Sequence, residues 1–140
     1  QNKKIITLIT KYDVQNNIYL FDQVDNIVKI MNILDINLLF SNYGEGFPNV
    51  LAESMLCGTP CIAFDIGDSK SIIGSLGWIA KKNDNQTFLN NLVKASKIKN
   101  KKSNEWIELK KKCRDRIISN YKIQEMINKH IQLWKEQKTR

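Results

Sequence analysis

The stretch SNYGEGFPNVLAES, residues 41–54, decides how the rest of the sequence is interpreted. It contains two glycines, Gly44 and Gly46, and two carboxylates, Glu45 and Glu53, with seven residues between them. The glycines allow a loop to bend sharply and to approach a ligand without a Cβ in between. The first glutamate falls in this loop, whereas the second falls where almost every neighbour is apolar. A carboxylate in an apolar segment needs a partner, because an isolated buried charge is costly.

A helix is predicted over residues 48–57, with Pro48 in its first turn and Gly58 just past its end. At about 100° per residue its apolar side chains cover most of the circumference, so the helix and Glu53 are expected to be largely buried. The N–H groups of Val50 and Leu51 are expected to be free at the helix N-terminus, which makes a ready anion site. A phosphate site with a carboxylate on either side suits a nucleotide sugar, which has a ribose, a pyrophosphate and a hexose.

Strands and helices alternate along the chain. Apolar, β-branched and aromatic segments predict strands at residues 17–23, 36–41, 60–65 and 77–82. Spacing and capping residues predict helices at 3–12, 26–34 after an Asp25 cap, 48–57, a short one capped by Ser69, 84–98, 103–120 and 122–138. Because the strands lack polar alternation, the fold class is α/β, a Rossmann-like parallel sheet with helices on both faces. Open sheets of this kind bind ligands at the carboxyl ends of their strands, where the loops 41–48 and 65–69 lie.

The length of 140 residues allows one domain or a piece of one. We expect a Rossmann-like domain over residues 1–98 and, over residues 99–140, C-terminal helices that pack on the same domain. No stretch approaches the ~18 apolar residues of a membrane span, and the N-terminus lacks the features of a signal peptide. The chain begins with Gln1 rather than Met, so an upstream part is expected to be missing.

The formal net charge of +8 is concentrated in the C-terminal third. Residues 1–93 carry 7 basic and 9 acidic side chains, whereas residues 94–140 carry 15 and 5. The basic helices are interpreted either as a solvated face or as a contact surface for an anionic membrane. Nucleic acid is not expected as a partner, because the aromatic residues of this part are too scattered to form a stacking platform.

The predicted C-terminal helices divide into a charged and an apolar side. The side chains expected in solvent are Lys94, Lys97, Lys101, Lys102, Lys110, Lys111, Lys112, Arg114 and Arg116. The side chains expected to pack inward are Trp106, Leu109, Ile117, Ile118, Ile127, Ile131 and Trp134.

Three cysteines and one histidine give no sign of a metal site. Cys57 and Cys61 are spaced C-x3-C, one residue too long for the redox C-x-x-C motif, and Cys113 is distant in sequence. The cysteines are expected to be buried and reduced, as in a cytosolic protein. His130 lies on a predicted helix without a visible partner, so a structural or exposed position is expected.

The sequence EGFPNVLAE, residues 45–53, followed by SMLCGTPCIAFDIGD, residues 54–68, resembles the donor-binding signature of retaining family-4 glycosyltransferases of the GT-B fold. The signature consists of E-x7-E, a Cys-Gly-x-Pro turn at the helix end, a buried strand and Asp-x-Gly. E-x7-E alone is weak, but its combination with C-G-x-P at the correct helix end is specific. The resemblance extends over roughly residues 1–98, and the chain departs from the pattern at Cys61, where valine is usual.

The resemblance implies that this is the donor-nucleotide-binding part of a GT-B C-terminal domain, truncated on its N-terminal side. It implies that Glu45 is the catalytic-site carboxylate, in contact with the donor sugar hydroxyls, and that Glu53 takes the two ribose hydroxyls. The turn of Gln23 and Val24 would read the base through its backbone. The donor sugar and phosphates would be lined by Gly46, Phe47, Pro48, Asn49, Val50 and Leu51.

The implied reaction is retaining transfer from a nucleoside-diphosphate sugar to an acceptor, in bacterial cell-surface glycan synthesis, in the cytoplasm or at the inner face of the cell membrane. No Asp-x-Asp motif is present, so no metal and no cofactor are expected, and the helix N-terminus would stabilise the leaving diphosphate. The acceptor-binding N-terminal domain of the same enzyme is a further partner and is not in this sequence. The same holds for the basic residues that begin the family's C-terminal domain, so the 140 residues alone are expected to be inactive.

Other interpretations stay open. The chain is also compatible with another GT-B enzyme, such as a nucleotide-sugar epimerase or a glycogen-synthase-like transferase. From a different class, residues 94–140 could act as a basic membrane- or nucleic-acid-binding module. A purely structural interpretation makes Glu45 a surface loop acid and Glu53 part of a helix salt bridge. A dinucleotide-binding module is disfavoured, because Asn49 stands where G-x-G-x-x-G needs its third glycine and no suitable acidic residue follows.

Overall fold

The fold is a three-stranded parallel sheet with helices on both faces, in a computed structural model that describes residues 3–101 and 104–138. The strands are β1 (Asn37–Leu39), β2 (Cys61–Phe64) and β3 (Trp78–Ala80), in the order β1-β2-β3. Leu38 pairs with Ile62, and Ile62 pairs with Trp78. The strands predicted at 36–41, 60–65 and 77–82 are confirmed, each as a shorter segment.

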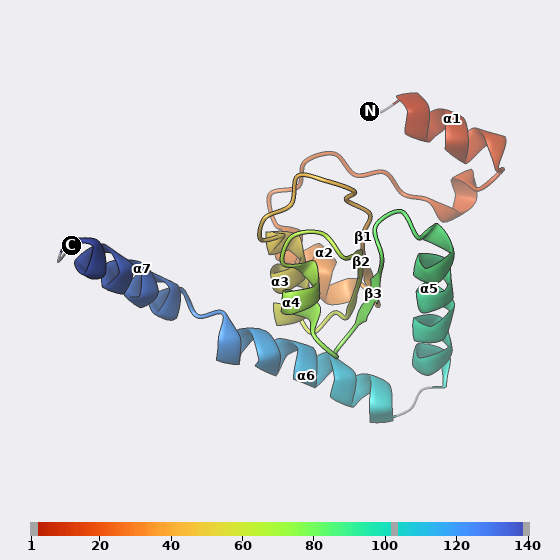
Figure 1. The fold of residues 1–140 in the computed structure, drawn as a ribbon. Helices are drawn as coiled ribbons and strands as arrows, with labels where there is room; N and C mark the ends of the chain where they lie inside the picture. The colour runs from red at the N-terminus through yellow and green to blue at the C-terminus, as the bar shows by residue number, and fades with distance from the viewer. Residues whose placement is uncertain (1–2, 102–103, 139–140) are drawn as a thin grey trace.

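The helices lie in two layers around this sheet. In Figure 1 helix α5 covers one face, whereas α3 and α4 cover the other and α6 runs across their ends. The described helices are α1 (Lys3–Lys11), the 3-10 turn η1 (Gln15–Asn17), α2 (Ile27–Ile33), α3 (Asn49–Leu56), α4 (Ser69–Ile73), α5 (Asn85–Asn100), α6 (Asn104–Asn120) and α7 (Ile123–Lys138). The expected α/β class is therefore confirmed, and α5 runs past residue 98, where we placed the end of the first unit.

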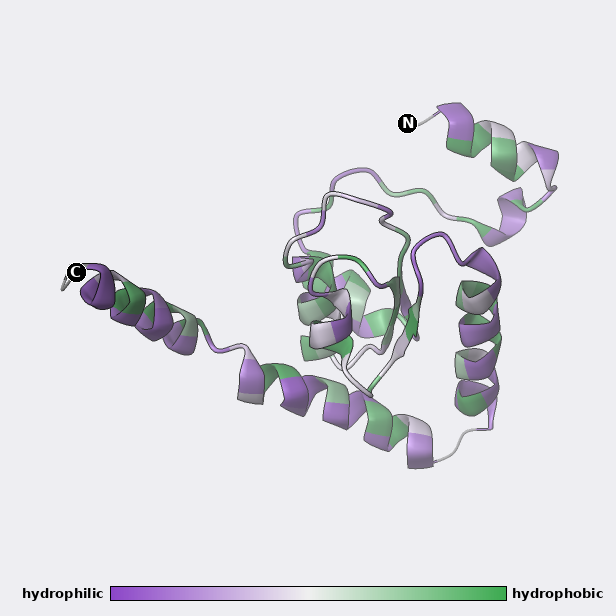
Figure 2. Cartoon of the chain, viewed as in Figure 1, coloured by the Kyte–Doolittle hydropathy of each residue, from purple (hydrophilic) through white to green (hydrophobic). Residues whose placement is uncertain are grey.

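Strand β2 supplies the centre of the core because its side chains alternate between the two faces. Cys61 and Ala63 pack against Leu51 and Met55 of α3 and the side chains of α4 and α6. Ile62 and Phe64 point the other way, into the layer formed by α5. All four side chains of β2 are buried, and Figure 2 shows hydrophobic segments on the helices that flank the strand.

Helix α6 is fastened to the ends of α3 and α4 by arginine side chains. Arg114 donates a hydrogen bond of 2.8 Å to the carbonyl of Leu56, the last residue of α3. Arg116 donates to the carbonyls of Ile72 at 2.8 Å and Ser71 at 2.7 Å in α4. Terminal carbonyls have no partner within their own helix, and a cation is favourable there. Arg114 and Arg116, which we predicted to be solvated charges, therefore have a structural role.

The predicted strand at residues 17–23 is wrong. Residues 18–24 form an irregular segment after η1, with Tyr19 and Phe21 exposed to 81% and 70%. A strand needs a neighbour for its backbone hydrogen bonds, and this segment pairs with none of the described strands.

Two predicted helix caps are displaced by one residue. Asn26, not Asp25, caps α2, because its side chain accepts the Lys29 N–H three residues later. Asp68, not Ser69, precedes α4, and the Ser69 hydroxyl donates instead to the carbonyl of Ile66 at 2.7 Å.

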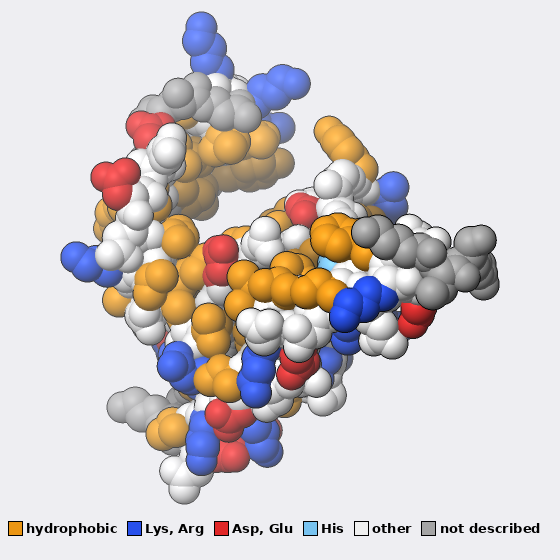
Figure 3. All heavy atoms as spheres, turned by 90° about the vertical axis from the view of Figure 1, so that its left-hand side faces the viewer, with side chains coloured by type: hydrophobic (Ala, Val, Ile, Leu, Met, Phe, Trp, Pro, Cys, Tyr) orange, Lys and Arg blue, Asp and Glu red, His pale blue; other side chains and the backbone are white. Residues whose placement is uncertain are grey.

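The prediction of inward-packing side chains holds for most of α6 and fails for α7. Trp106 and Ile117 are buried and Leu109 is half-buried, as expected. Ile127, Ile131 and Trp134 were expected inside but are exposed, because α7 runs away from the sheet (Figure 1). Ile118, on α6, was also expected inside and is exposed. Figure 3 shows hydrophobic side chains at the surface on this side of the molecule. Of the lysines expected in solvent, Lys110 is half-buried, Lys102 lies outside the described residues, and the exposed ones are Lys94, Lys97, Lys101, Lys111 and Lys112.

Candidate functional site

The loops that follow β1 and β2 are in direct contact at the carboxyl end of the sheet. The amide of Asp68 donates a hydrogen bond of 2.8 Å to the carbonyl of Gly46. Gly67 makes this approach possible, since its φ is +54° and a Cβ there would lie 2.5 Å from the carbonyl oxygen of Glu45. The Asp-x-Gly pattern of residues 65–67 thus supports the loop that carries the first glutamate.

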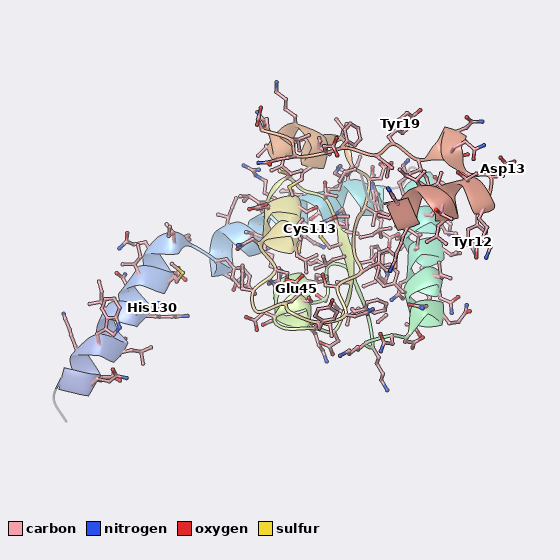
Figure 4. All side chains as sticks on the ribbon, turned by 90° about the horizontal axis from the view of Figure 1, so that it is seen from above. Tyr12, Asp13, Tyr19, Glu45, Cys113 and His130 are labelled. Carbon is pink, nitrogen blue, oxygen red and sulfur yellow. The ribbon has the colours of Figure 1, made fainter. Side chains whose placement is uncertain are left out.

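Glu45 is half-buried at the end of β1, and Figure 4 shows it over the central part of the fold. The hydroxyl of Ser41 donates a hydrogen bond of 2.6 Å to its Oε1 atom. Gly44 has a φ of +81°, a backbone conformation that residues with a side chain rarely adopt. A Cβ added at Gly46 would meet no atom within 4 Å. The backbone at Gly46 therefore borders open space next to the Glu45 carboxylate.

The N-terminus of α3 begins at the buried Pro48. The amide of Leu51 donates to the carbonyl of Pro48 at 3.0 Å, so the prediction that this N–H group is free is wrong. The amides of Asn49 and Val50 have no hydrogen-bond acceptor within the described part of the chain. An anion at this helix end would therefore meet two free N–H groups, those of Asn49 and Val50.

Glu53 is exposed, which corrects the expectation that it is buried. Leu51, Ser54 and Met55 face the core, because the sheet, α4 and α6 lie on that side of α3. The opposite side of the helix, which carries Glu53, faces outward. Within the described residues the Glu53 carboxylate forms no ion pair, so it is available to an external hydrogen-bond donor.

This outward side of α3 forms one wall of an open cavity of about 730 Å³. Phe47, Asn49 and Glu53 line it from one side, and residues of α6 and α7 line it from the other. The rings of Phe47 and Tyr121 are in contact, with centroids 5.5 Å apart, and they connect the two sides.

Six of the predicted site residues thus divide into three groups. Phe47, Asn49 and Glu53 share the cavity, whereas Glu45 lies beside the loop after β2 and does not line it. Gln23 and Val24 lie in the exposed segment before α2, also outside the cavity. The sequence analysis did not predict that α7 lines this cavity. The helical spacing of apolar residues along 123–134 was nevertheless a sign that one side of this helix packs against a partner.

The thiols and the histidine have structural surroundings. Burial raises the pKa of Cys61 and of Cys113 to about 12, which makes both poor nucleophiles. Cys57 is half-buried, so the expectation of buried cysteines holds for two of the three. The Nδ1 atom of His130 lies 2.9 Å from the carbonyl of Met126, so this exposed histidine has a partner on its own helix.

Solved structures with this arrangement identify the fold as GT-B. A glycosyltransferase from Rickettsia africae superimposes with a TM-score of 0.85 and 21% identity over 95% of this chain and 35% of its own. Sucrose-phosphate synthase from Thermosynechococcus elongatus superimposes with a TM-score of 0.80 and 20% identity, over 98% of this chain and 34% of its own. TarM superimposes with a TM-score of 0.75 and 21% identity, over 94% of this chain and 26% of its own.

The chain belongs to the family described as glycosyl transferases group 1, whose sequence pattern matches residues 1–113. A curated relative, N-acetyl-alpha-D-glucosaminyl L-malate synthase from Bacillus anthracis, is 29% identical over 82 residues. This match covers 57% of the present chain and 21% of the relative. The chain therefore matches about a fifth of the length of this relative and about a third or less of the solved structures.

Proposed function

We propose that this chain is the donor-binding part of a retaining glycosyltransferase that transfers a sugar from a nucleoside-diphosphate sugar to an acceptor. The observation that carries the proposal is the arrangement at the N-terminus of α3. Two free amides, those of Asn49 and Val50, stand in the sequence between Glu45, which Ser41 holds at the sheet edge, and Glu53, which shares a cavity with Asn49. Family membership supports sugar transfer as the reaction.

Each group has a distinct task in this proposal. The amides stabilise the negative charge that develops on the leaving diphosphate, and no metal is required for it. Glu45, held by Ser41, accepts hydrogen bonds from the hydroxyls of the transferred sugar. Glu53 accepts hydrogen bonds from the ribose hydroxyls, and the backbone of Gln23 and Val24 contacts the base.

The acceptor is bound by a further domain of a longer enzyme. The 140 residues alone are then inactive, because transfer requires an acceptor hydroxyl placed against the donor carbon. The name of the curated relative makes N-acetylglucosaminyl donors the first choice for assays with the longer enzyme.

The place of action we propose is the cytoplasm or the inner face of the cell membrane, in cell-surface glycan synthesis. Among the described helices, none is long and apolar enough to cross a membrane. The exposed lysines of α5 and α6 would attract anionic lipid by up to about 1 kcal/mol each, less at high salt. Sedimentation with vesicles of increasing phosphatidylglycerol content tests this contact, and binding that ignores lipid charge and salt would contradict it.

Saturation-transfer NMR with UDP, GDP and ADP tests the proposed function on the 140-residue chain itself. We expect one of the three to receive saturation on its ribose protons, and the corresponding nucleotide sugar to displace it. The matching 2′-deoxynucleotide serves as the control and is expected to bind more weakly. If none of the three diphosphates binds, the donor-site assignment is wrong.

A further inference from the structure

We propose that Tyr121 is a positioning residue of the donor site. Its ring holds the side chain of Phe47, and through Phe47 it fixes the backbone that carries Glu45 and leads into α3. This inference rests on the proposed function. It adds a residue from the end of α6 that lies outside the signature at residues 45–68, and that acts through Phe47 rather than by touching the donor.

The chain enters α3 without the usual local support. In many helices the apolar residue before the N-cap packs on the apolar residue four positions into the helix, and this contact fixes the direction of entry. Pro48 is the N-cap of α3 and makes no side-chain cap, so the two residues in question are Phe47 and Ala52. Ala52 offers a single methyl group, which covers little of a phenyl ring. The ring of Phe47 therefore depends on a partner from a distant part of the chain.

Tyr121 is such a partner. The centroids of the two rings lie 5.5 Å apart with an angle of 58° between the ring planes. Tilted pairs at this distance are favourable, because the positive edge of one ring meets the negative face of the other. Phe47 remains 41% exposed, so its ring has room to move if the contact is lost.

Tyr121 is itself fixed from three directions. Its amide donates a hydrogen bond of 3.0 Å to the carbonyl of Ile117, at the end of α6. Its hydroxyl donates one of 3.0 Å to the carbonyl of Ser71 in α4. Its side chain also packs on the core cluster that contains Leu51 and Ile117. A ring with these restraints can in turn restrain Phe47.

The position of Phe47 affects the groups that would bind the donor. Glu45 and Gly46 precede it in the chain, and the free amides of Asn49 and Val50 follow it. A turn of the backbone at Phe47 would therefore change the direction of these amides. Hydrogen bonds weaken steeply as their angle departs from the preferred range, so a displaced turn would lower the affinity for a diphosphate.

Two substitutions of Tyr121 separate its ring from its hydroxyl. Tyr121→Leu removes the ring contact and is expected to weaken binding of UDP, GDP or ADP, whichever the wild-type chain binds, about threefold to tenfold, the range that the loss of an aromatic pair allows. Tyr121→Phe keeps the ring, and the carbonyl of Ser71 still accepts from Arg116 at 2.7 Å. This variant is expected to bind nearly as tightly as the wild type. Calorimetric titration of the 140-residue chain measures both affinities.

Arg116→Ala is the control for a merely structural effect. It removes hydrogen bonds to α4, including one to the same Ser71 carbonyl, and leaves the pair of Phe47 and Tyr121 in place. It should lose stability in urea unfolding, as Tyr121→Leu does, but keep wild-type affinity at a temperature where both variants are folded. A readout without ligand is the ¹⁵N–¹H spectrum, in which Tyr121→Leu should shift the amide signals of Asn49 and Val50 and Arg116→Ala should not.

Phe47→Leu removes the same contact from the other side. Because Phe47 is partly exposed, this variant keeps the test available if Tyr121→Leu does not fold. It is expected to weaken diphosphate binding as well. Adding Tyr121→Leu to it should cause little further loss, since residues that act through one shared contact are not additive.

The outcomes separate this inference from the proposed function. If a diphosphate binds the wild-type chain and binds Tyr121→Leu equally well, the donor site is correct and the positioning role is wrong. Equal losses of affinity in Tyr121→Leu and Arg116→Ala would also overturn the role, because stability would then explain both. Fully additive losses in Phe47→Leu and Tyr121→Leu would show that the two rings act separately. If no diphosphate binds the wild-type chain, the proposed function fails and the positioning role fails with it.

Discussion

The hydroxyl of Ser41 lies 2.6 Å from a carboxylate oxygen of Glu45, at the point where the chain leaves β1. Hydrogen bonds to an ionised group are short and strong, so this contact restricts the direction of the carboxylate. The loop after β2 supports the same segment through the bond from Asp68 to Gly46. Glu45 is therefore held from two sides before any ligand is bound.

Removing Glu45 is expected to separate catalysis from nucleotide binding. In the longer enzyme, Glu45→Ala should lower turnover about 100-fold or more, while affinity for the free diphosphate, which has no sugar, stays nearly the same. Ser41→Ala should lower turnover about tenfold, because the carboxylate loses its charged hydrogen bond. Steady-state kinetics and calorimetry with the diphosphate measure the two effects, with Tyr43→Phe on the same loop as a control. A parallel loss of diphosphate affinity in Glu45→Ala would place this residue elsewhere.

Glu53→Gln is expected to weaken nucleotide binding through the ribose. Hydrogen bonds to charged groups contribute about 1.5–3 kcal/mol, and exposure places Glu53 at the lower end, so a loss of about tenfold is expected. Calorimetric titration of ribo- and 2′-deoxyribonucleotides into both proteins measures it. The wild-type chain should prefer the ribonucleotide, and the variant should have lost most of that preference. Equal binding of the two sugars by the wild-type chain would refute the ribose assignment.

Gly67→Ala is expected to destabilise the fold by about 1–3 kcal/mol. The new Cβ would collide with the backbone of Glu45 and Gly46, and the positive φ disfavours any side chain. Urea unfolding followed by circular dichroism measures the change. Gly46→Ala is the control, since its Cβ meets nothing within 4 Å and its stability should remain close to that of the wild type. Equal stability of the two variants would mean that the loops are not in contact.

Arg116→Ala is expected to lower the free energy of unfolding by about 1–3 kcal/mol. The substitution leaves the carbonyls of Ser71 and Ile72 without the guanidinium that they accept from. Lys111→Ala, on the exposed side of the same helix, should change stability little. The comparison uses urea unfolding at one ionic strength, and an equal loss in both variants would show that the hydrogen bonds of Arg116 are not responsible.

Stability is expected to fall at alkaline pH because of the buried thiols. Burial raises the pKa of Cys61 from 9.0 to about 12, so the unfolded chain releases this proton first as the pH increases. The free energy of unfolding should be independent of this group below pH 8 and should decline between pH 9 and 12, by up to about 1.4 kcal/mol per pH unit. Urea unfolding at pH 7, 8, 9 and 10 measures the decline. In Cys61→Val the free energy of unfolding should decline less steeply with pH. Identical slopes in the two proteins would show that Cys61 is not responsible for the decline.

The parts of the fold that local residues determine could be predicted from the sequence. Pro48 and Gly58 mark the two ends of α3 within one residue, and the uniformly apolar segment around Ile62 predicts a strand that is buried on both faces. In each case the physical cause lies within a few positions of the chain. The position of the loops after β1 and β2 at one edge of the sheet could also be predicted, since parallel strands end at the same edge.

The errors concern features that depend on distant neighbours. The segment 17–23 has the composition of a strand, but no described strand lies beside it. The helical wheel of α3 counts apolar residues, but it does not show that α4, α6 and the sheet all lie opposite Glu53. The direction of α7 depends on the two residues between it and α6, which no apolar pattern specifies. For the same reason the far wall of the cavity could not be predicted.

The arginines of α6 also affect how the chain acquires its fold during synthesis. Arg114 and Arg116 bond carbonyls that lie 58 and 44 residues earlier. In a nascent chain that ends before α6, the residues of β1, β2 and β3 have already been synthesised. Part of the apolar core is then uncovered, because α6 contributes to it, and the ends of α3 and α4 lack the hydrogen bonds from the arginines. Uncovered apolar surface of this kind promotes aggregation. We therefore expect the ribosome-bound chain to depend on chaperones until residue 120 has emerged.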